Sequence, residues 1–340
     1  MSPKFNETVP LEIQNKGVYK TVKQHLPEYN IGKVRDTFLL PDHSDKLLVV
    51  ATDRVSIFDF VLNCTIPRKG EVLTAMTHFW LTKVLNVPNH LVTWGPTIND
   101  FLPKQLHNND KLRRRALIVQ KLKMVDKECI VRGNLTGSGL KDYERTGELC
   151  GIKLPQGLHD GSKLDPAIFT PSTKAKQGHD ENISAEEVIA QYPGIDIASL
   201  DIFHTARDYA SSRGIILADT KLEFGVTDDG KYILADEVIT PDSSRFWDRG
   251  EYENAAEMHR APSGYDKQPL RIAGKSASIY GEKADLSRFD PSDDEDIDTV
   301  HDWKVPKLMR ENTSFRYLNI FKLLIGPHLD KYQLKSMGIL

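Results

Sequence analysis

Apolar residues in the first part of the chain come in short runs that indicate strands. From Ile31 onward, apolar residues fill 38–40 and 47–51, and the turn-forming segment 41–45 separates these two runs. Two such runs on either side of a short turn predict a β-hairpin, which Gly32 introduces. The folded body of the chain therefore begins with antiparallel strands.

A change to helical spacing comes next. Apolar side chains recur at intervals of three and four over 72–84, before Pro88 ends the run, which predicts a helix. Residues 116–120 are a further strand candidate, and the polar segment 121–127 is typical of a connection between two lobes. Because clefts between lobes commonly hold ligands, we expect a binding site near this connection.

The second half of the chain adds helices and another hairpin. A capping box at 184–187 predicts the start of one helix, and a second helix is expected over 199–213, closed by Gly214. Two strand-like runs over 214–238 are joined by a turn signal at 228–230. Hairpins mixed with helices, together with a glycine-containing flap, suit a two-lobed α+β architecture.

The two ends of the chain predict less structure. Residues 1–30 fit an extension or short helix without chemistry, and 289–298 is acidic enough to form a surface linker. A last amphipathic helix follows, with Phe315, Leu318, Phe321 and Leu324 as its apolar face. The predicted division is an N-terminal extension (1–30), a first lobe (31–120), a second lobe (121–271) and a C-terminal linker with a helical segment (272–340).

Composition narrows the class of protein. The chain has 340 residues, which exceeds the length that a single hydrophobic core usually supports, so two or more lobes are expected. Its net charge of -3 argues against a general affinity for nucleic acid. Its three cysteines show no metal-binding spacing, and no apolar run is long enough to span a membrane. The start of the chain lacks the apolar core of a signal peptide. We therefore expect a cytoplasmic protein.

The hairpin over 214–238 carries the most informative charges. Asp219, Lys221 and Glu223 fall on one strand face, because side chains alternate with a period of two. A turn centred near Asp229 places Glu223 opposite Asp236, and two facing carboxylates repel unless a cation lies between them. Magnesium with a phosphate is the simplest such cation, and Lys221 would neutralise phosphate charge. The alternative is that these charges line a solvated face of the sheet. A shift of the strand register by one residue would also place the two carboxylates on opposite faces.

Three further segments are candidates for binding anions. Lys33 and Arg35 lie on a flap at 32–36 that is not a Walker A loop, and its alternative role is a basic edge that prevents aggregation. The segment 131–139 brings Arg132 close to three glycines, although a plain turn would look the same. The segment 240–248 follows the second acidic strand and supplies Asp242, Ser243, Ser244 and Arg245. Residues 179–181 are predicted to form a surface loop.

Nine segments in order then identify a resemblance. They are IGKVRD, VATDRVSIFD, ECIVRGNLTGSG, LPQGL, IFTPSTKA, DENIS, ADTKLEFG, ADEVITPDSSRFWD and YDKQPLR, spread over residues 31–271. Together they resemble the SAICAR synthetase family, the phosphoribosylaminoimidazole-succinocarboxamide synthases of purine biosynthesis. Beyond Arg271 the sequence does not follow the pattern expected of that family, in which a helical segment soon follows YDKQ.

The resemblance implies both a fold and a reaction. The fold would be α+β and two-lobed, similar to ATP-grasp enzymes, with antiparallel sheets and a C-terminal helical segment. The reaction would join carboxyaminoimidazole ribonucleotide (CAIR) to L-aspartate with ATP and Mg²⁺, through an acyl phosphate. A carboxylate becomes a good electrophile only when its oxygen is phosphorylated. No nucleic acid, membrane or obligatory protein partner is expected.

The resemblance also implies a set of site residues. Lys221, Asp219 and Arg245 would be catalytic, and Glu223 and Asp236 would hold the metal. ATP would contact Gly32, Lys33, Val34, Arg35, Gln120, Lys121, Leu122, Met124 and Glu128, with adenine held largely by the backbone of 120–124. The ribonucleotide and aspartate would contact Asp53, Arg54, Ser56, Arg132, Ser138, Ser172, Thr173, Lys174, Asp242, Ser243 and Arg245.

Two other functions remain compatible with the same residues. A small-molecule or lipid kinase would share the ATP and metal site but transfer phosphate to a hydroxyl group. A catalytically silent nucleotide-binding protein would keep the fold alone. The candidate residues Lys221, Glu223, Asp236 and Arg245 are all present, which favours an active enzyme.

Overall fold

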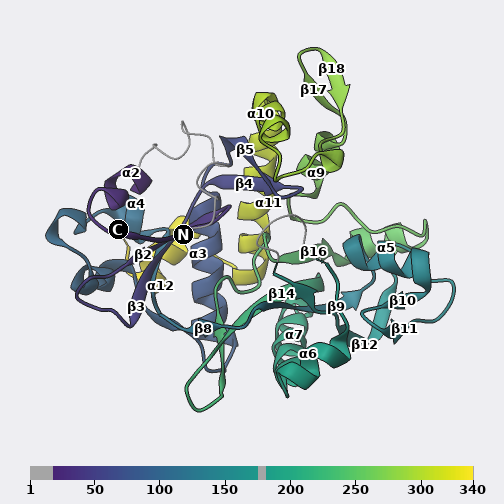
Figure 1. Cartoon of the computed structure of the whole chain (residues 1–340), viewed down its shortest axis with the longest axis horizontal. Helices are drawn as coiled ribbons and strands as arrows, with labels where there is room; N and C mark the ends of the chain where they lie inside the picture. The colour runs from purple at the N-terminus through teal and green to yellow at the C-terminus, as the bar shows by residue number, and fades with distance from the viewer. Residues whose placement is uncertain (1–17, 175–180, 340) are drawn as a thin grey trace.

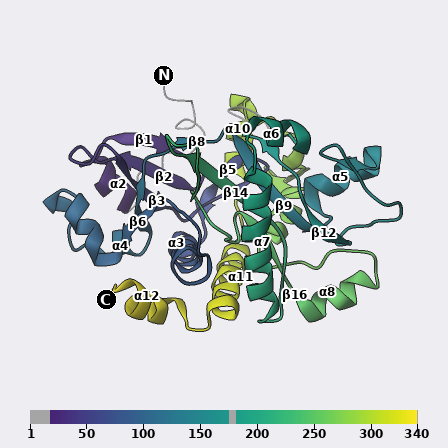
Figure 2. The same cartoon turned by 90° about the horizontal axis from the view of Figure 1, so that it is seen from below.

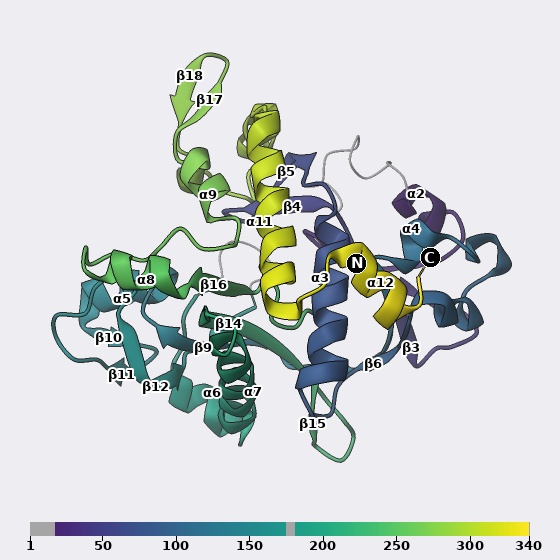
Figure 3. The same ribbon diagram turned by 180° about the vertical axis from the view of Figure 1, so that it is seen from behind.

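Two antiparallel sheets form the framework of the molecule, and helices α3 (Lys69–Phe79) and α11 (Lys307–Ile325) lie side by side between them (Figure 1, Figure 3). The structure, a computed structural model, describes residues 18–174 and 181–339. In these ranges no helix is long and apolar enough to cross a membrane.

The first sheet has five strands and comes from the first third of the chain. Its order is β1 (Glu28–Ile31), β2 (Arg35–Leu39), β3 (Lys46–Ala51), β7 (Ala116–Gln120) and β6 (Leu91–Trp94). The predicted hairpin is confirmed, because Phe38 pairs with Leu48. Gly32 lies in the tight turn between β1 and β2, so a further strand precedes it. Residues 28–31 thus join the sheet through main-chain pairing that their mostly exposed side chains do not reveal.

The second sheet has seven strands and is built around one long strand. Strand β14 (Ile215–Val226) pairs with β9 (Lys127–Asn134), β15 (Tyr232–Ala235), β16 (Ser244–Asp248) and β8 (Lys123–Met124), and β9 in turn pairs with β12 (Lys163–Phe169) and β13 (Ser172–Thr173). Separate two-stranded ribbons are β4 (Arg54–Ile57) with β5 (Phe60–Thr65), β10 (Glu148–Leu149) with β11 (Ile152–Lys153), and β17 (Ala277–Ile279) with β18 (Glu282–Ala284). The predicted hairpin after Gly214 is therefore β14 with β15.

Helices cover both sheets (Figure 2). Besides α3 and α11 they are α2 (Val18–Lys23), α4 (Asp110–Arg113), α5 (Gly137–Thr146), α6 (Ala185–Gln191), α7 (Ile195–Ser211), α8 (Arg249–Ala256), α9 (Gln268–Gly274), α10 (Asp294–Asp302) and α12 (Leu329–Met337). Short 3-10 turns are η3 (Gly95–Phe101), η4 (Lys104–Leu106) and η5 (Leu286–Arg288), and a π-helical turn, η2 (Trp80–Val84), extends α3. The helices predicted over 72–84 and 199–213 are confirmed, and Ser184 Oγ accepts the Glu187 N–H as the capping box requires.

The main core lies where α3, α7 and α11 meet the second sheet. Met76 and Trp80 pack there with Phe203 and Phe321, all of them fully buried. A smaller core on the far face of the first sheet contains Val22, from a segment predicted to be an extension. These cores fix the two sheets on opposite sides of α3.

The C-terminal region differs most from its prediction. The acidic run 289–298 is not a linker throughout, because Asp293 caps α10 and Ile297 of this helix is buried. On α11 the buried face contains Tyr317, Phe321 and Leu324, whereas Phe315 is 66% exposed, so that part of the predicted face is wrong. The segment after YDKQ forms α9 directly and then the projecting β17–β18 hairpin (Figure 3). Charged residues are frequent in this region, so the sequence pattern did not reveal the few apolar residues that pack these elements into the core.

Candidate active site

The predicted pairing of Glu223 with Asp236 is wrong by one residue. In the β14–β15 ladder Glu223 lies opposite Ala235. Asp236 comes just after β15 and has a φ of 56°, a left-handed conformation that Asp tolerates better than most residues. This change of backbone direction turns the Asp236 side chain towards Glu223, and the partners of Glu223, Lys174 and Lys221, also lower the pKa of Asp236. The two carboxylates therefore meet, through a turn and not through strand register.

Three cations surround this pair, and we call the whole group the acid cluster: Glu223, Asp236 and Glu237 with Arg35, Lys174 and Lys221. Arg35 Nη2 lies 2.6 Å from Asp236 Oδ2 and also pairs with Glu237. Lys174 pairs with Glu223, and Lys221 Nζ lies 3.7 Å from Glu223 Oε1. The acid cluster thus draws its charges from both sheets.

These neighbours decide the charge states of the acid cluster. Burial alone would raise the pKa of Asp236, but Arg35 and the two lysines outweigh it and hold that pKa below its usual value. Burial would lower the pKa of Lys221, yet Glu223 and Glu128 raise it. Both Asp236 and Lys221 are therefore charged at neutral pH.

The donor set of the acid cluster fits magnesium. Mg²⁺ commonly takes one or two carboxylates and completes its shell with phosphate oxygens and water. Among the described residues, no group of three or more His, Cys, Asp or Glu side chains forms a metal cage. Glu223 and Asp236 are thus suited to a metal that arrives with a phosphate.

The flap between β1 and β2 is held by a buried arginine. Arg54, only 2% exposed, binds Asp36 at 2.5 Å and donates to the carbonyl oxygens of Gly32 (2.9 Å) and Lys33 (3.2 Å). The Val34 carbonyl accepts from the Thr52 N–H at 2.9 Å. This bracing leaves the Lys33 side chain on the surface side, 2.6 Å from Asp59.

The other residues expected near the flap have structural partners. Asp53 Oδ1 accepts the Gly70 N–H at 2.9 Å and pairs with Arg115 at 3.2 Å. Ser56 is buried on β4. Arg54 and Asp53 hold the flap and the start of α3 in place.

A second group of charges lies further along β14. Asp219 Oδ2 accepts from Arg132 Nη1 at 3.1 Å and also from Arg245 Nη1. We call Arg132 and Arg245 with Asp219 the arginine pair. Arg132 also binds Ser138 Oγ and Thr170 Oγ1, each at 3.1 Å. Two guanidinium groups share one carboxylate, so the arginine pair keeps one net positive charge for an anion.

Two glycines make room for the arginine pair. A Cβ atom on Gly137 would lie 2.6 Å from Arg245 Nη2, and one on Gly139 would lie 3.1 Å from Arg132 Nε. Gly137 also has a φ of +61°, which few other residues adopt. The glycine-rich segment therefore packs directly on the two guanidinium groups instead of forming a plain surface turn.

Asp242, two residues before β16, lies in a buried ionic group. It forms an ion pair with Lys69 and accepts a 2.5 Å hydrogen bond from the Tyr317 hydroxyl group. Burial would raise the pKa of Asp242, but Lys69 and Lys267 hold it well below its usual value. Burial lowers the pKa of Lys267 to about 8 despite the attraction of Asp242. Ser243 contributes its carbonyl oxygen to the Lys221 N–H at 2.8 Å.

The segment after β7 connects the two sheets. The Gln120 N–H donates to the His90 carbonyl oxygen at 2.8 Å, and Lys121 Nζ lies 5.0 Å from the Tyr29 ring centroid. Leu122 contacts Gly225, and Met124, 40% exposed, pairs with the same glycine from β8. The predicted connection is thus held at both ends, by Gln120 against the first sheet and by Met124 against β14.

Glu128 links the connection to the acid cluster. It pairs with Lys221 and accepts from Ser172 Oγ at 3.3 Å. Thr173 Oγ1 accepts the Glu181 N–H at 3.0 Å. These contacts fix β13 next to the site and direct Lys174 onto Glu223.

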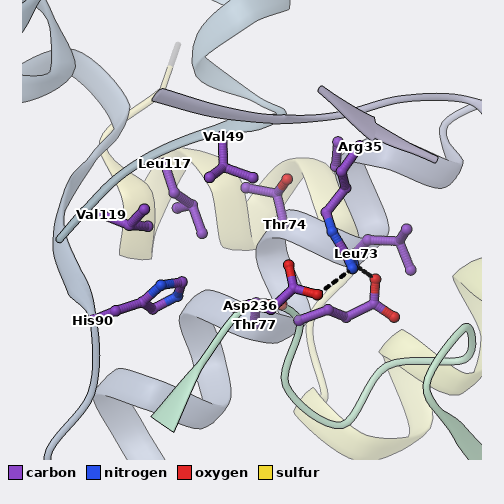
Figure 4. A pocket seen from close by; sticks show the side chains of 11 residues that line it. Arg35, Val49, Leu73, Thr74, Thr77, His90, Leu117, Val119 and Asp236 are labelled. Atoms are coloured by element: carbon purple, nitrogen blue, oxygen red, sulfur yellow. Dashed lines mark hydrogen bonds and ion pairs between the residues drawn. The ribbon is translucent and has the colours of Figure 1, made fainter. Parts of the chain in front are cut away.

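A narrow cavity of about 20 Å³ lies between the first sheet and the acid cluster; counting the part open to solvent, the hollow measures about 330 Å³ (Figure 4). Arg35, Asp236 and Glu237 line one end, and His90 and Val119 line the other. Burial and the nearby Arg35 lower the pKa of His90 to about 4, so its ring is neutral.

Comparison with known proteins decides the family. A model of the SAICAR synthetase family matches residues 28–286. The chain belongs to the SAICAR synthetase family. The resemblance drawn from the nine segments is confirmed, and the chain is a ligase that forms a carbon–nitrogen bond.

Relatives extend the match beyond the nine segments. The phosphoribosylaminoimidazole-succinocarboxamide synthase of Maridesulfovibrio salexigens is 40% identical over 324 residues, covering 93% of this chain and 99% of that protein. The enzyme of the same name from Thermodesulfovibrio yellowstonii is 49% identical over 248 residues, covering 71% and 81% of the two chains. The first match includes much of the region after residue 271, so that region is shared with this relative.

Solved structures agree with the fold. SAICAR synthase from Saccharomyces cerevisiae complexed with SAICAR has a TM-score of 0.75 and 34% identity, covering 93% of this chain and 99% of that chain. Another SAICAR synthase structure has a TM-score of 0.73 and 35% identity, covering 89% and 96%. The mixed fold of helices and antiparallel sheets predicted from the sequence is confirmed.

Nine of the predicted site residues gather in two places. Arg35, Lys174, Lys221, Glu223 and Asp236 meet in the acid cluster, and Arg132, Ser138, Asp219 and Arg245 meet around the arginine pair. Sequence reasoning missed Glu237, Lys69 and Tyr317. Glu237 directly follows Asp236, so its place in the sequence could have indicated it. Lys69 and Tyr317 reach Asp242 only through tertiary packing. His179 and Asp180 lie outside the described residues.

Proposed function

We propose that this member of the SAICAR synthetase family uses ATP to join the 4-carboxylate of CAIR to the amino group of L-aspartate, giving SAICAR, ADP and phosphate. The observation that supports this proposal most strongly is the order of the charged side chains along one face of β14. Asp219 belongs to the arginine pair, and Lys221 and Glu223 belong to the acid cluster. Four residues of strand span ~13 Å, which is on the scale of one ribonucleotide.

The arginine pair is the proposed site of the ribonucleotide phosphate. Its net positive charge, the planar forks of two guanidinium groups and the Ser138 hydroxyl suit a phosphate dianion. Burial strengthens this attraction, because water is excluded around Arg132. The carboxylate of CAIR would then point along β14 towards Lys221.

ATP is proposed to lie between the two sheets, in a two-lobed arrangement similar to ATP-grasp enzymes. The flap with Lys33 and Arg35 would cover the phosphates, and the backbone of 120–124 would hold adenine. Glu223 and Asp236 would hold Mg²⁺, which would offset the charge of the phosphates. The division at residues 30, 120 and 271 and a cytoplasmic location stay predictions.

The proposed chemistry has two steps. A carboxylate oxygen of CAIR attacks the γ-phosphorus of ATP, the bond from that phosphorus to the bridging oxygen breaks, and ADP leaves. Lys221, held charged by Glu223 and Glu128, would stabilise the transferring phosphoryl group. The neutral amine of aspartate then attacks the carbonyl carbon of the acyl phosphate, phosphate leaves, and the new amide nitrogen loses a proton.

The test is ADP release by the purified protein with ATP and magnesium, adding CAIR and L-aspartate separately and then together. Release that requires CAIR, with SAICAR formed only when both are present, supports the proposal. Release with an unrelated hydroxyl acceptor only would support a kinase, and ATP binding without turnover would support a silent homologue.

A further inference from the structure

Helix α2 lies beside the first sheet and brings an aromatic side chain to the end of β3 (Figure 2). Val22 of this helix is fully buried in one cluster with Phe38 and Leu48 of the sheet, which fixes the helix there. Tyr19, one turn earlier, donates its hydroxyl group to the Ala51 carbonyl oxygen at 3.3 Å. A segment predicted to be an extension without chemistry therefore places a side chain on a strand that borders the flap.

The ring of Tyr19 faces the arginine that braces the flap. Its centroid lies 5.9 Å from the central guanidinium carbon of Arg54, within the range of a cation–π contact. On the other side, Arg115 Nη1 donates to Tyr19 Oη at 3.1 Å and also pairs with Asp53 at 3.2 Å. Tyr19 therefore contacts two arginines, one through its ring and the other through its hydroxyl group.

Arg54 connects Tyr19 to the flap through all three of its guanidinium nitrogens. Nε donates to the Lys33 carbonyl oxygen, Nη1 to the Asp36 carboxylate, and Nη2 to both Asp36 and the Gly32 carbonyl oxygen. Because successive side chains of a strand point to opposite faces, Asp36 meets Arg54 on one face of β2 while Arg35 reaches the acid cluster from the other. The place of Arg54 thus decides where the flap and Arg35 lie.

We propose that Tyr19 is a positioning residue for ATP, which holds Arg54 in the orientation that keeps the flap and Arg35 in place at the phosphates. This inference rests on the proposed function, which places the ATP phosphates under the flap. The contacts of Tyr19 are to Arg54, Arg115 and the main chain, so it acts through them and touches no substrate. Loss of Tyr19 should therefore weaken ATP binding and leave CAIR binding at the arginine pair unchanged.

The first experiment separates the binding of ATP from the binding of CAIR. Steady-state SAICAR formation is measured for the wild type, Tyr19→Leu and Lys20→Ala, with each substrate varied in turn. In Tyr19→Leu we expect the KM for ATP to rise about tenfold, from the loss of a cation–π contact and two hydrogen bonds, and the KM for CAIR to stay constant. Lys20→Ala removes an exposed side chain from the same helix and should change neither constant. An equal rise in both KM values, or an unchanged KM for ATP, would overturn the inference.

A double-mutant cycle tests the route through Arg54. Arg54→Lys keeps the charge but loses the planar fork, so by itself it should raise the KM for ATP. Adding Tyr19→Leu to Arg54→Lys should raise this KM little further, because both changes remove the same brace. Tyr19→Phe keeps the ring against Arg54 and should retain most of the affinity for ATP. Additive effects in the double variant, or equal damage in Tyr19→Phe and Tyr19→Leu, would contradict a role through Arg54.

Limited digestion with trypsin reports on the flap without any substrate. Trypsin cuts where the chain opens locally, so cleavage after Lys33 should be about tenfold faster in Tyr19→Leu than in the wild type, with cleavage elsewhere unchanged. Equal cleavage after Lys33 would refute the inference even while SAICAR formation upholds the proposed function. Faster cleavage at every site would assign Tyr19 to folding alone and would also refute it. Faster cleavage after Lys33 alone, with no SAICAR formed by the wild type, would support the brace and mark a failure of the proposed function.

Discussion

The arginine pair and the acid cluster are two charged sites on one strand, built in opposite ways. Arg132 and Arg245 come from β9 and β16, the direct neighbours of β14, and both bind Asp219 across the ladder. The acid cluster instead takes Arg35 from the first sheet, 201 residues away from Asp236 in sequence. One site is fixed by the hydrogen bonds of a single sheet, and the other depends on how two sheets meet.

This difference suits two kinds of ligand. Arg132 has polar partners on all three guanidinium nitrogens, supplied by β14, by α5 and by the segment after β12, so it is ordered before any substrate arrives. Arg35, Lys174 and Lys221 are partly exposed and are bound to carboxylates that we expect to hold a metal. Their pairing can therefore change when phosphates enter, whereas the strand neighbours of β14 place both arginines of the arginine pair next to Asp219.

The largest expected effect comes from the acid cluster. Asp236→Asn keeps a residue that tolerates the left-handed conformation but removes the charge needed for a metal. We expect turnover to fall by roughly 10³-fold, the worth of several kcal/mol of charge stabilisation. Steady-state SAICAR formation across a magnesium titration would measure it, with circular dichroism as the check on folding. Turnover at the wild-type rate would remove Asp236 from the metal site.

The arginine pair should affect binding more than chemistry. Arg245→Ala removes a charge-assisted contact to the proposed phosphate, so the KM for CAIR should rise by roughly 10²-fold while kcat falls much less. Initial rates at varied CAIR give both constants. Arg249→Ala, four residues later and bound to Ser211, is the matched control and should change neither. An unchanged KM in Arg245→Ala would contradict the phosphate site.

A glycine substitution tests whether the arginine pair is held rigidly. In Gly137→Ala the new methyl group would displace Arg245, so we expect the KM for CAIR to rise about tenfold, as for one weakened charged hydrogen bond. Gly147→Ala is the control, because Gly147 has a similar φ of +74° but nothing within 4 Å of its Cβ position. Both variants should lose about 1 kcal/mol of stability from backbone strain. Equal KM values would show that Arg245 moves freely.

The smallest effect concerns stability and pH. The pKa of Lys267 is lowered to about 8, so between pH 8 and its usual 10.5 the unfolded chain binds a proton that the folded chain does not. The free energy of unfolding should therefore rise with pH across this window by roughly 1–3 kcal/mol relative to Lys267→Met, which has no amine. Denaturant titrations at pH 7.5 and 10 measure the difference. Lys283→Met on β18 is the exposed control, and parallel behaviour of wild type and Lys267→Met would be contrary to the expectation.

Local sequence patterns predicted the helices and strands whose apolar residues repeat with the period of the element. The β2–β3 hairpin, α3 and α7 were found because their apolar residues repeat at the spacing of the element. Alternation along β14 also placed Asp219, Lys221 and Glu223 on one face, which the contacts of all three bear out. The same reasoning failed at α10, where a few buried residues such as Ile297 outweigh many charges.

By itself the sequence determined the strands, the order of the charged segments and, through nine motifs, the family. Only the tertiary structure decided that Asp236 reaches Glu223 through a left-handed turn and not through ladder register. It also decided that Lys69 and Tyr317 converge on Asp242. The physical reason is that side-chain periodicity reports neighbours along one element, whereas a turn's dihedral angle and the approach of distant elements depend on packing across the whole core.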